Sequence, residues 1–256
     1  MNKIVLNRVL PHGKIQKVFE NIWFVKGQVK MPMLFPPMKI SRSMTIVKNP
    51  SNNEITLINA MPLDDQTLIE LSSLGDIKNT LNVGGFHGRD DNFYKEKFGA
   101  KIYAIKGQAY SKKFDKVPIE PKDGYLQADV WLDEHSELPI QNSSLKIFKT
   151  SNPIEAILYI EQGGGILVTG DSLQHTEAPD NFFNLPAKIM MKKFGFFKPY
   201  NVGPGWVQFA KPSLKDIRSI LDLEFQNVLP GHGDAVIGNA KEKYRPILEG
   251  EIKGCH

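Results

Sequence analysis

The sequence predicts an α/β protein, and two observations lead to this class. First, short β-branched or aromatic runs alternate along the chain with segments that carry helix-capping signals. Second, three apolar runs each end just before a histidine or an aspartate: TLNV leads to His87, GILVTG to Asp171, and QNVLP to His232. Loops converge at the ends of strands in α/β proteins, and ligands bind there. We therefore expect these three side chains to lie near one another.

The first eighty residues predict strands followed by one helix. The helix is DDQTLIELSSLG, with Asp64 or Asp65 as its N-cap and Gly75 at its end. The three prolines of MPMLFPPM (31–38) exclude regular structure, so this apolar loop either packs over the core or lines a pocket. Strands are expected at 22–29, 43–49 and 54–60, the last two as a hairpin.

The rest of the chain continues the alternation. Gly163–Gly165 predicts a hairpin turn, Ser213 predicts a helix N-cap, and GPGWVQF (203–209) predicts a turn with a packed Trp206. Helices are expected at 91–98, 213–223 and 239–249. Further strands are expected at 77–83, 101–106, 144–149, 155–162, 165–170 and 225–230.

Composition is that of a soluble globular protein. No linker divides the 256 residues, so we expect one domain over 1–256. The net charge is +4 and the 32 Lys and Arg residues are scattered, which gives no support to nucleic-acid binding. Cys255 is the single cysteine, so an intrachain disulfide or a cysteine-based zinc site cannot form. The sequence shows neither a signal peptide nor an apolar run of roughly 18 residues, and we expect a cytoplasmic protein.

The loop GGFHGRDDNF (84–93) raises the question of a metal site. Imidazole and carboxylate groups together suit zinc, iron or manganese. One histidine or aspartate after a strand is usually a turn residue. Three such positions, two of them next to glycine in TGD and GHG, favour a site more strongly.

The motifs ILVTGDSL and VLPGHG resemble two late motifs of the metallo-β-lactamase-fold hydrolases, in that family's order. FGAKIYA is similar to the strand that follows the family's main metal motif, and the likeness extends over residues 20–248. The resemblance implies a four-layer αββα sandwich with the site at the shared edge of its two sheets. It also implies that His87, Asp171 and His232 are metal ligands.

The family's signature H-x-H-x-D-H is degenerate in this sequence, and two registers compete. In the first, which we prefer because polar groups then face the site, the four positions are Gly85, His87, Arg89 and Asp90. In the second, His87 takes the last position, and the others are Asn82, Gly84 and Phe86. The family's further histidine falls in KTSNP, where this chain has Ser151 or Asn152.

Arg89 leaves two alternatives open. A guanidinium cannot be a ligand, and at about 5 Å it would repel a dication by roughly 6–7 kcal/mol. Either Arg89 turns outward and one metal ion (Zn, Fe or Mn) binds to His87, Asp171, His232 and Asp90, or it pairs with Asp171 or Asp90 and no metal binds. In the first case Asp90 or Asp91 is a candidate base and Arg89 a candidate anion-binding group. Asp91 has the alternative role of helix N-cap.

Three further residues are candidates for substrate contact. His175 lies four residues after Asp171, near the same rim. Phe183 belongs to the Phe, Met and Lys-rich segment 182–198, and Trp206 follows that segment. This segment is either a lid over a hydrophobic substrate, a peripheral membrane-surface helix, or an inserted helix packed on the domain or on a second subunit. We favour the packed helix over membrane contact.

Two classes of function therefore remain. One is a hydrolase with at most one metal ion that acts on a small ester, thioester or lactone-like substrate. The other is a non-catalytic binding protein on the same fold, in which Arg89 replaces the metal. The absence of a G-x-S-x-G motif and the terminal position of Cys255 disfavour serine and thiol hydrolases.

Overall fold

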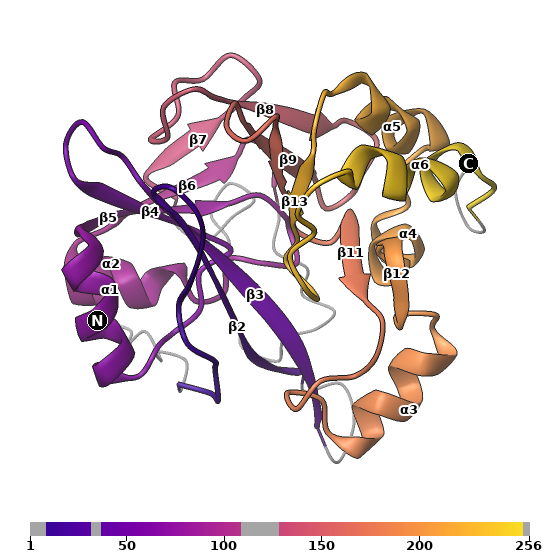
Figure 1. Ribbon diagram of the computed structural model, residues 1–256, viewed down its shortest axis with the longest axis horizontal. Helices are drawn as coiled ribbons and strands as arrows, with labels where there is room; N and C mark the ends of the chain where they lie inside the picture. The colour runs from indigo at the N-terminus through magenta and orange to yellow at the C-terminus, as the bar shows by residue number, and fades with distance from the viewer. Residues whose placement is uncertain (1–8, 32–36, 109–127, 253–256) are drawn as a thin grey trace.

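Two β-sheets face each other in the structure, and helices cover both of their outer faces (Figure 1). The computed structural model describes residues 9–31, 37–108 and 128–252. The layers are the αββα arrangement that the sequence resemblance implied. Figure 1 also shows that the N-terminal part of the chain forms one half of the sandwich and the C-terminal part forms the other. Helices α1 and α2 lie on one side, and α4, α5 and α6 lie on the opposite side.

The seven-stranded sheet begins antiparallel and ends parallel. Its order follows the chain, and β4, β5, β6 and β7 run parallel to one another. The carboxyl end of β5 therefore leads into the loop that carries His87. The strands are β1 (Gln16–Phe19), β2 (Ile22–Met31), β3 (Met38–Lys48), β4 (Glu54–Ile58), β5 (Asp76–Asn82), β6 (Lys101–Ile105) and β7 (Val130–Leu132).

The second sheet has four strands in the order β13-β10-β9-β8. Because β10 and β13 are parallel neighbours, the loops after them emerge side by side. These are the loops that carry Asp171 and His232. The strands are β8 (Ser143–Phe148), β9 (Glu155–Ile160), β10 (Ile166–Val168) and β13 (Asn227–Leu229), with a separate antiparallel pair of β11 (Leu173–Thr176) and β12 (Lys198–Val202).

The helices carry the start signals expected of them. Asp64 and Ser213 cap α1 and α5 as predicted, each accepting a backbone N–H three residues on, and Asn184 caps α3 in the same way. The helices are α1 (Asp65–Leu74), α2 (Asp91–Phe98), α3 (Leu185–Lys193), α4 (Pro204–Ala210), α5 (Leu214–Arg218) with the 3-10 turn η2 (Ser219–Asp222), and α6 (Ala240–Glu249).

The core consists of one apolar layer between the sheets and one under each group of helices. Ile58, Leu81 and Leu158 belong to the layer between the sheets. Leu68 and Leu71 of α1 pack against the seven-stranded sheet, and the helices after residue 204 pack against the four-stranded sheet. Each sheet is thus covered on both faces, which explains why its strands are apolar runs with few polar positions.

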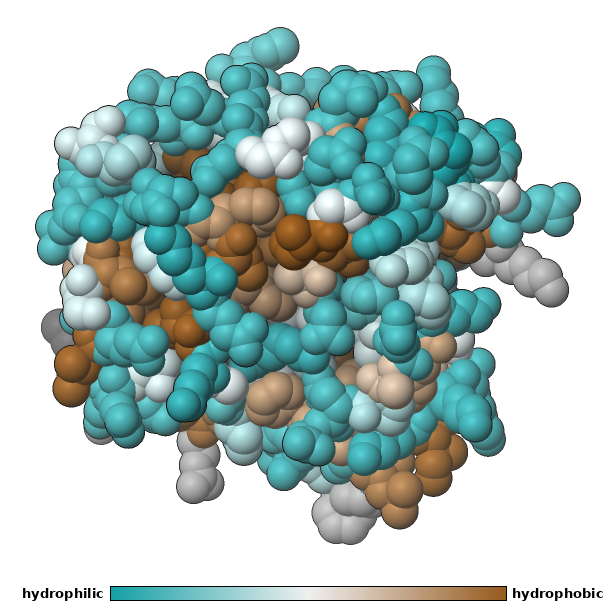
Figure 2. Space-filling view, viewed as in Figure 1, coloured by the Kyte–Doolittle hydropathy of each residue, from teal (hydrophilic) through white to brown (hydrophobic). Residues whose placement is uncertain are grey.

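The segment after Phe182 forms the inserted, packed helix that we favoured. Ala187 and Met191 of α3 are buried with Met38 and Ile40 of β3. Leu185, Ile189 and Phe194 are the exposed apolar residues of this region. They contribute to the apolar surface at the lower right of Figure 2, where Figure 1 places α3.

Three local expectations were wrong. Residues 203–209 were expected as a turn, but Gly203 is the N-cap of α4 and residues 204–209 belong to that helix, because Pro204 stands at a first-turn position where proline suits a helix. The N-cap of α2 is Asp90 rather than Asp91, and its side chain makes no capping hydrogen bond. The strand expected at 43–49 begins earlier, at Met38. Residues 32–36 of the proline-rich segment and Cys255 lie outside the described residues.

None of the helices within the described residues is both long enough and apolar enough to cross a membrane.

Candidate metal centre and adjoining pocket

Three loops bring His87, Asp171 and His232 together at one edge of the sandwich. One ligand atom from each of the three lies within 4.8 Å of the other two. The side chains expose only 9%, 12% and 9% of their surface, so that charges interact here with little screening by water. The convergence expected from the sequence is therefore present.

The spacing of the three side chains suits one metal ion. Nε2 of His87 lies 3.2 Å from one carboxylate oxygen of Asp171, and Nε2 of His232 lies 3.3 Å from the other. The two imidazole centroids are 5.4 Å apart. Two ligands of a tetrahedral zinc ion, each bound at about 2.0–2.1 Å, are themselves about 3.4 Å apart. The donor set and its spacing thus fit a divalent transition metal.

The backbone of β3 orients His232. Nδ1 of His232 lies 2.7 Å from the carbonyl oxygen of Ser41, an acceptor that fixes the proton on Nδ1. Nε2 is the nitrogen that faces Asp171, and it is the one left to bind a metal ion once its proton is released, as in histidines that bind metals. Burial lowers the pKa of His232, but the hydrogen bond and charge of Asp171 outweigh burial and raise it.

Asp171 is held in its ionised form by the two histidines. Burial alone would raise the pKa of Asp171, yet the charge of His87 and the hydrogen bonds from His232 and His87 lower it well below the usual range. Gln174 also donates to a carboxylate oxygen of Asp171 at 3.4 Å. The ionised carboxylate and the two imidazoles can bind a cation when the histidines release their Nε2 protons.

Glycine is required where these loops touch. A Cβ atom on Gly231 would lie 2.5 Å from the carbonyl oxygen of Gly170 and 3.0 Å from Cε1 of His87. A Cβ atom on Gly84 would lie 3.1 Å from a carboxylate oxygen of Glu155 and 3.3 Å from Cδ2 of His87. The glycines of the GHG and GGFHG motifs therefore allow the ligand loops to approach.

Glu155, at the start of β9, is a site residue that the sequence argument missed. Its side chain is buried, and one carboxylate oxygen accepts a 2.6 Å hydrogen bond from the backbone N–H of Ser172. Burial, together with the charge of Asp171, raises the pKa of Glu155 to about 8 despite that hydrogen bond. Glu155 thus fixes the loop that carries Asp171. The signal in the sequence was a lone acid that opens the otherwise apolar run EAILYI.

Asp90 and Asp91 lie in a second buried group, beside β3. Arg42, a residue that the sequence argument also missed, pairs with Asp90 at 2.5 Å. Burial and the charge of Asp90 raise the pKa of Asp91 well above its usual value, against the opposing charge of Arg42. Neither aspartate belongs to the metal-binding group found among the described residues or to the pocket lining. Their placement gives no support to a role as ligand or base.

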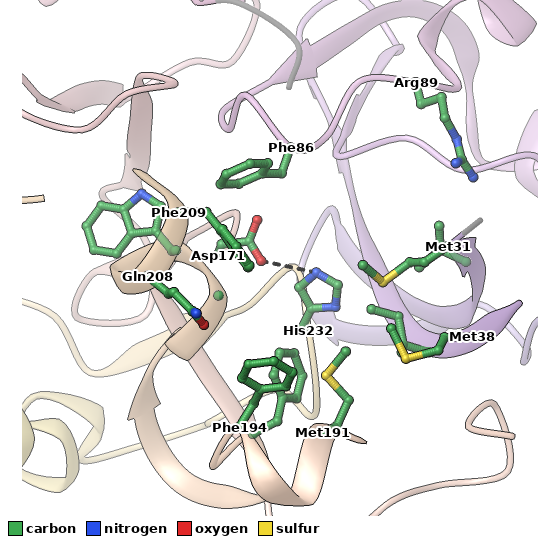
Figure 3. A pocket seen from close by; sticks show the side chains of 15 residues that line it. Met31, Met38, Phe86, Arg89, Asp171, Met191, Phe194, Gln208, Phe209 and His232 are labelled. Carbon is green, nitrogen blue, oxygen red and sulfur yellow. Dashed lines mark ion pairs between the residues drawn. The ribbon is translucent and has the colours of Figure 1, made fainter. Parts of the chain in front are cut away.

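Arg89 lies at the edge of the pocket, apart from Asp171 and His232 (Figure 3). Its Nη1 donates to the carbonyl oxygen of Lys30 at 3.4 Å. The groups that lower the pKa of Asp171 are the two histidines. Arg89 is therefore turned toward β2 and not toward the space between the three ligands.

Ser151, one of the two positions matched to the family's further histidine, makes structural contacts. Its hydroxyl donates to the carbonyl oxygen of Pro153 at 2.6 Å and accepts from the indole N–H of Trp206 at 3.1 Å. Asn152 is exposed. This part of the site holds Trp206 in place instead of supplying a ligand.

An apolar pocket opens beside the metal-binding group (Figure 3). Asp171 and His232 contribute to its wall, so a molecule in the pocket would meet both ligands. Arg89 and Gln208 are its other polar residues. The remaining lining is apolar or glycine: Val29, Met31, Met38, Ile40, Phe86, Met191, Phe194, Phe196, Gly205, Trp206 and Phe209.

The three residues expected to contact substrate are placed differently from one another. Trp206 lines the pocket, although its indole is fully buried. Phe183 packs beneath α3, with its ring 5.3 Å from that of Phe197, and is not part of the lining. His175 stacks on Tyr200 at 4.6 Å, and its Nδ1 accepts the backbone N–H of that residue. Burial lowers the pKa of His175.

Comparison with solved structures identifies the fold. The chain is similar to the DIM-1 metallo-β-lactamase exposed to ceftazidime, with a TM-score of 0.59 and 15% identity over 95% of this chain and 99% of that one. The mono-zinc form of the metallo-β-lactamase FIM-1 from Pseudomonas aeruginosa has a TM-score of 0.57 and 14% identity, over 95% of this chain and 97% of that one. A β-lactamase domain protein from Burkholderia ambifaria has a TM-score of 0.52 and 13% identity, over 94% of this chain and 74% of that one. No protein-family model and no curated protein sequence matches the chain.

These likenesses show that the chain has the metallo-β-lactamase fold, as the motifs around Asp171 and His232 implied.

Proposed function

We propose that this chain with the metallo-β-lactamase fold is a metal-dependent hydrolase of a small ester, thioester or lactone-like substrate. It holds at most one metal ion, on His87, Asp171 and His232. The observation that carries the proposal is the convergence of these three ligand atoms within 4.8 Å, beside a pocket to which Asp171 and His232 contribute.

A single metal ion is consistent with the rest of the site. The other signature positions hold Gly85, Arg89 and Asp90 in one register, and Asp90 is engaged by Arg42. One of the similar structures is a mono-zinc form of its protein, so the fold accommodates one zinc ion. Zinc, iron and manganese all suit the donor set.

The chain's own residues supply positioning. Ser41 fixes the tautomer of His232, and Glu155 fixes the loop that carries Asp171. When bound, a divalent metal would polarise a carbonyl oxygen and lower the pKa of water toward neutrality. The apolar lining excludes bulk water, which strengthens electrostatic interactions at the reacting carbonyl. Arg89 at the pocket edge gives a positive charge for an anionic part of the substrate.

The test is metal analysis of protein purified after growth with added zinc, iron and manganese. We expect about one equivalent of transition metal, because three ligands and one open position describe a catalytic site. His232→Ala should lose the metal together with hydrolysis of aryl esters and thioesters. His135→Ala, which changes an exposed histidine away from the site, is the matched control and should keep both.

Metal-free protein after that growth, with no hydrolysis of any ester, thioester or lactone, would refute the proposal. It would favour the binding protein without catalysis.

A further inference from the structure

The pocket beside the metal-binding group has a definite size and a definite chemistry. Its cavity measures about 160 Å³. An apolar cavity of about 150 Å³ is large enough to bind benzene. The space beside Asp171 and His232 is therefore sufficient for one six-carbon ring or a short branched alkyl group.

The walls of the pocket are fixed by the core. Met38 and Ile40 of β3 face Met191 of α3, and each of these side chains is at most 7% exposed. They belong to a packed cluster, and packed interiors transmit strain instead of expanding. The space between these side chains can therefore widen only if α3 moves away from β3.

The apolar wall and the metal-binding group are in direct contact. The ring of Phe196 packs edge-on against the imidazole of His232, with centroids 5.8 Å apart. An apolar group that fills the cavity would place the atoms attached to it next to His232 and Asp171. Burial of such a group stabilises the complex in proportion to the apolar area removed from water.

We propose that the pocket selects an acyl substrate whose carbonyl carries one compact apolar group of about phenyl size. Acetyl groups are too small to fill the cavity, and two-ring groups exceed it. The position of the carbonyl rests on the proposed function, whereas the size and apolarity of the group rest on the cavity alone.

The test is a binding series with primary amides, in which the carbonyl is kept and the leaving group is poor. Acetamide, phenylacetamide and diphenylacetamide are titrated into the protein as purified, labelled with ¹³C in the methionine methyl groups. Met31, Met38 and Met191 line the pocket, while Met44 and Met61 are buried under α1 and serve as internal controls. We expect phenylacetamide to shift the first three signals and to bind about tenfold tighter, or more, than either other amide.

Two variants check the cavity directly. Met31→Trp fills it from a partly exposed position and should weaken phenylacetamide binding at least about tenfold. Ile69→Trp makes the same change on exposed Ile69 of α1 and should leave binding unaltered. Phe196→Ala enlarges the cavity and should move the preference toward diphenylacetamide.

Equal affinity for the three amides in the unaltered protein would overturn the inference, as would shifts of Met44 and Met61 that match those of the pocket methionines. The outcome for the proposed function is separate. Selective binding without ester hydrolysis would refute the function and keep the inference. Ester hydrolysis without size selection would keep the proposed function and refute the inference.

Discussion

Three buried carboxyl groups near the site have pKa values that are shifted in opposite directions. Asp171 lies between two imidazoles, and their charge and hydrogen bonds lower its pKa in spite of burial. Glu155 and Asp91 are equally buried but have another carboxylate as neighbour, so their pKa values rise. The residue type therefore says little about charge state until the neighbours are known.

Asp91 gives a prediction on stability and pH. Because its pKa is raised in the folded protein, the folded state keeps a proton that the unfolded chain releases above a pH of about 4. The contribution of Asp91 to stability is therefore present at acid pH and is lost as pH rises toward the raised pKa. Asp91→Asn cannot titrate. Wild type should therefore lose stability relative to Asp91→Asn as the pH rises. The difference, free energy of unfolding of the variant minus that of wild type, should increase from pH 4 to pH 7 by up to about 1.4 kcal/mol per pH unit.

Urea denaturation of both proteins across that pH range measures the difference. Asp65→Asn, at the exposed start of α1, is the control and should show a small difference that does not grow in this way. A constant offset for Asp91→Asn would contradict the prediction.

Glu155 gives a second prediction at the residue scale. Glu155→Ala leaves the buried backbone N–H of Ser172 without its acceptor, which should cost about 1–3 kcal/mol of unfolding free energy. Glu155→Gln keeps an oxygen in place and resembles the protonated acid, so it should cost clearly less at pH 7. Denaturation in the presence of a chelator keeps metal affinity out of the measurement. Equal losses in the two variants would argue against the positioning role.

At the scale of elements, the ligand loops depend on close backbone contacts at the ends of β5, β10 and β13. The N–H of Gly231 donates to the carbonyl of Gly170 at 3.2 Å, and the N–H of Ser43 donates to the carbonyl of Gly231 at 2.8 Å. These bonds tie both ligand-carrying loops of the four-stranded sheet to each other and to β3. The glycine at this crossing is thus part of the site geometry.

Gly231→Ala should therefore lower metal occupancy more than it lowers stability. The added Cβ atom must displace the Gly170 carbonyl or the ring of His87. A ligand shifted by a few tenths of an ångström departs from metal-binding distances. We expect at least a tenfold loss of metal affinity in a chelator competition assay. Gly205→Ala, in α4 with open space around its Cβ position, should keep the affinity of wild type.

At the scale of the whole molecule, the site exists because the two sheets are held in register. The side-chain amide of Asn59, just after β4, donates to the carbonyl of Thr169 at the end of β10, at 2.9 Å and in a buried position. This bond joins the two sheets two residues before Asp171. It connects residues 110 positions apart in the sequence.

Asn59→Ala should destabilise the protein more than Asn53→Ala, which is a closely matched change. Both asparagines have left-handed backbone conformations, with φ of 55° and 62°, but Asn53 lies in an exposed turn. Each alanine incurs the cost of that conformation, and only Asn59→Ala also removes the buried bond between the sheets. We expect an additional loss of about 1–3 kcal/mol in the free energy of unfolding. Equal losses of unfolding free energy in the two variants would show that the hydrogen bond from Asn59 does not stabilise the contact between the sheets.

Local signals predicted most of the elements and part of the site. The caps Asp64 and Ser213 and the turn at Gly163–Gly165 depend on neighbours in sequence, so the sequence was enough to find them. The helix at Pro204 was missed because the G-P pair is typical of turns as well as of helix starts. The sequence showed that neither Ser151 nor Asn152 keeps the family's further histidine, but it did not show the contact of Ser151 with Trp206.

The sequence by itself determined which chemical groups follow the strands, and hence that His87, Asp171 and His232 are the candidate ligands. Tertiary structure alone decided that Arg42 pairs with Asp90, that Glu155 stands behind Asp171, and that a cavity of one-ring size adjoins them. The physical reason is that a capping or turn preference is set by the nearest few residues. Ion pairing, pKa and cavity shape are set by side chains from distant segments, which only packing brings together.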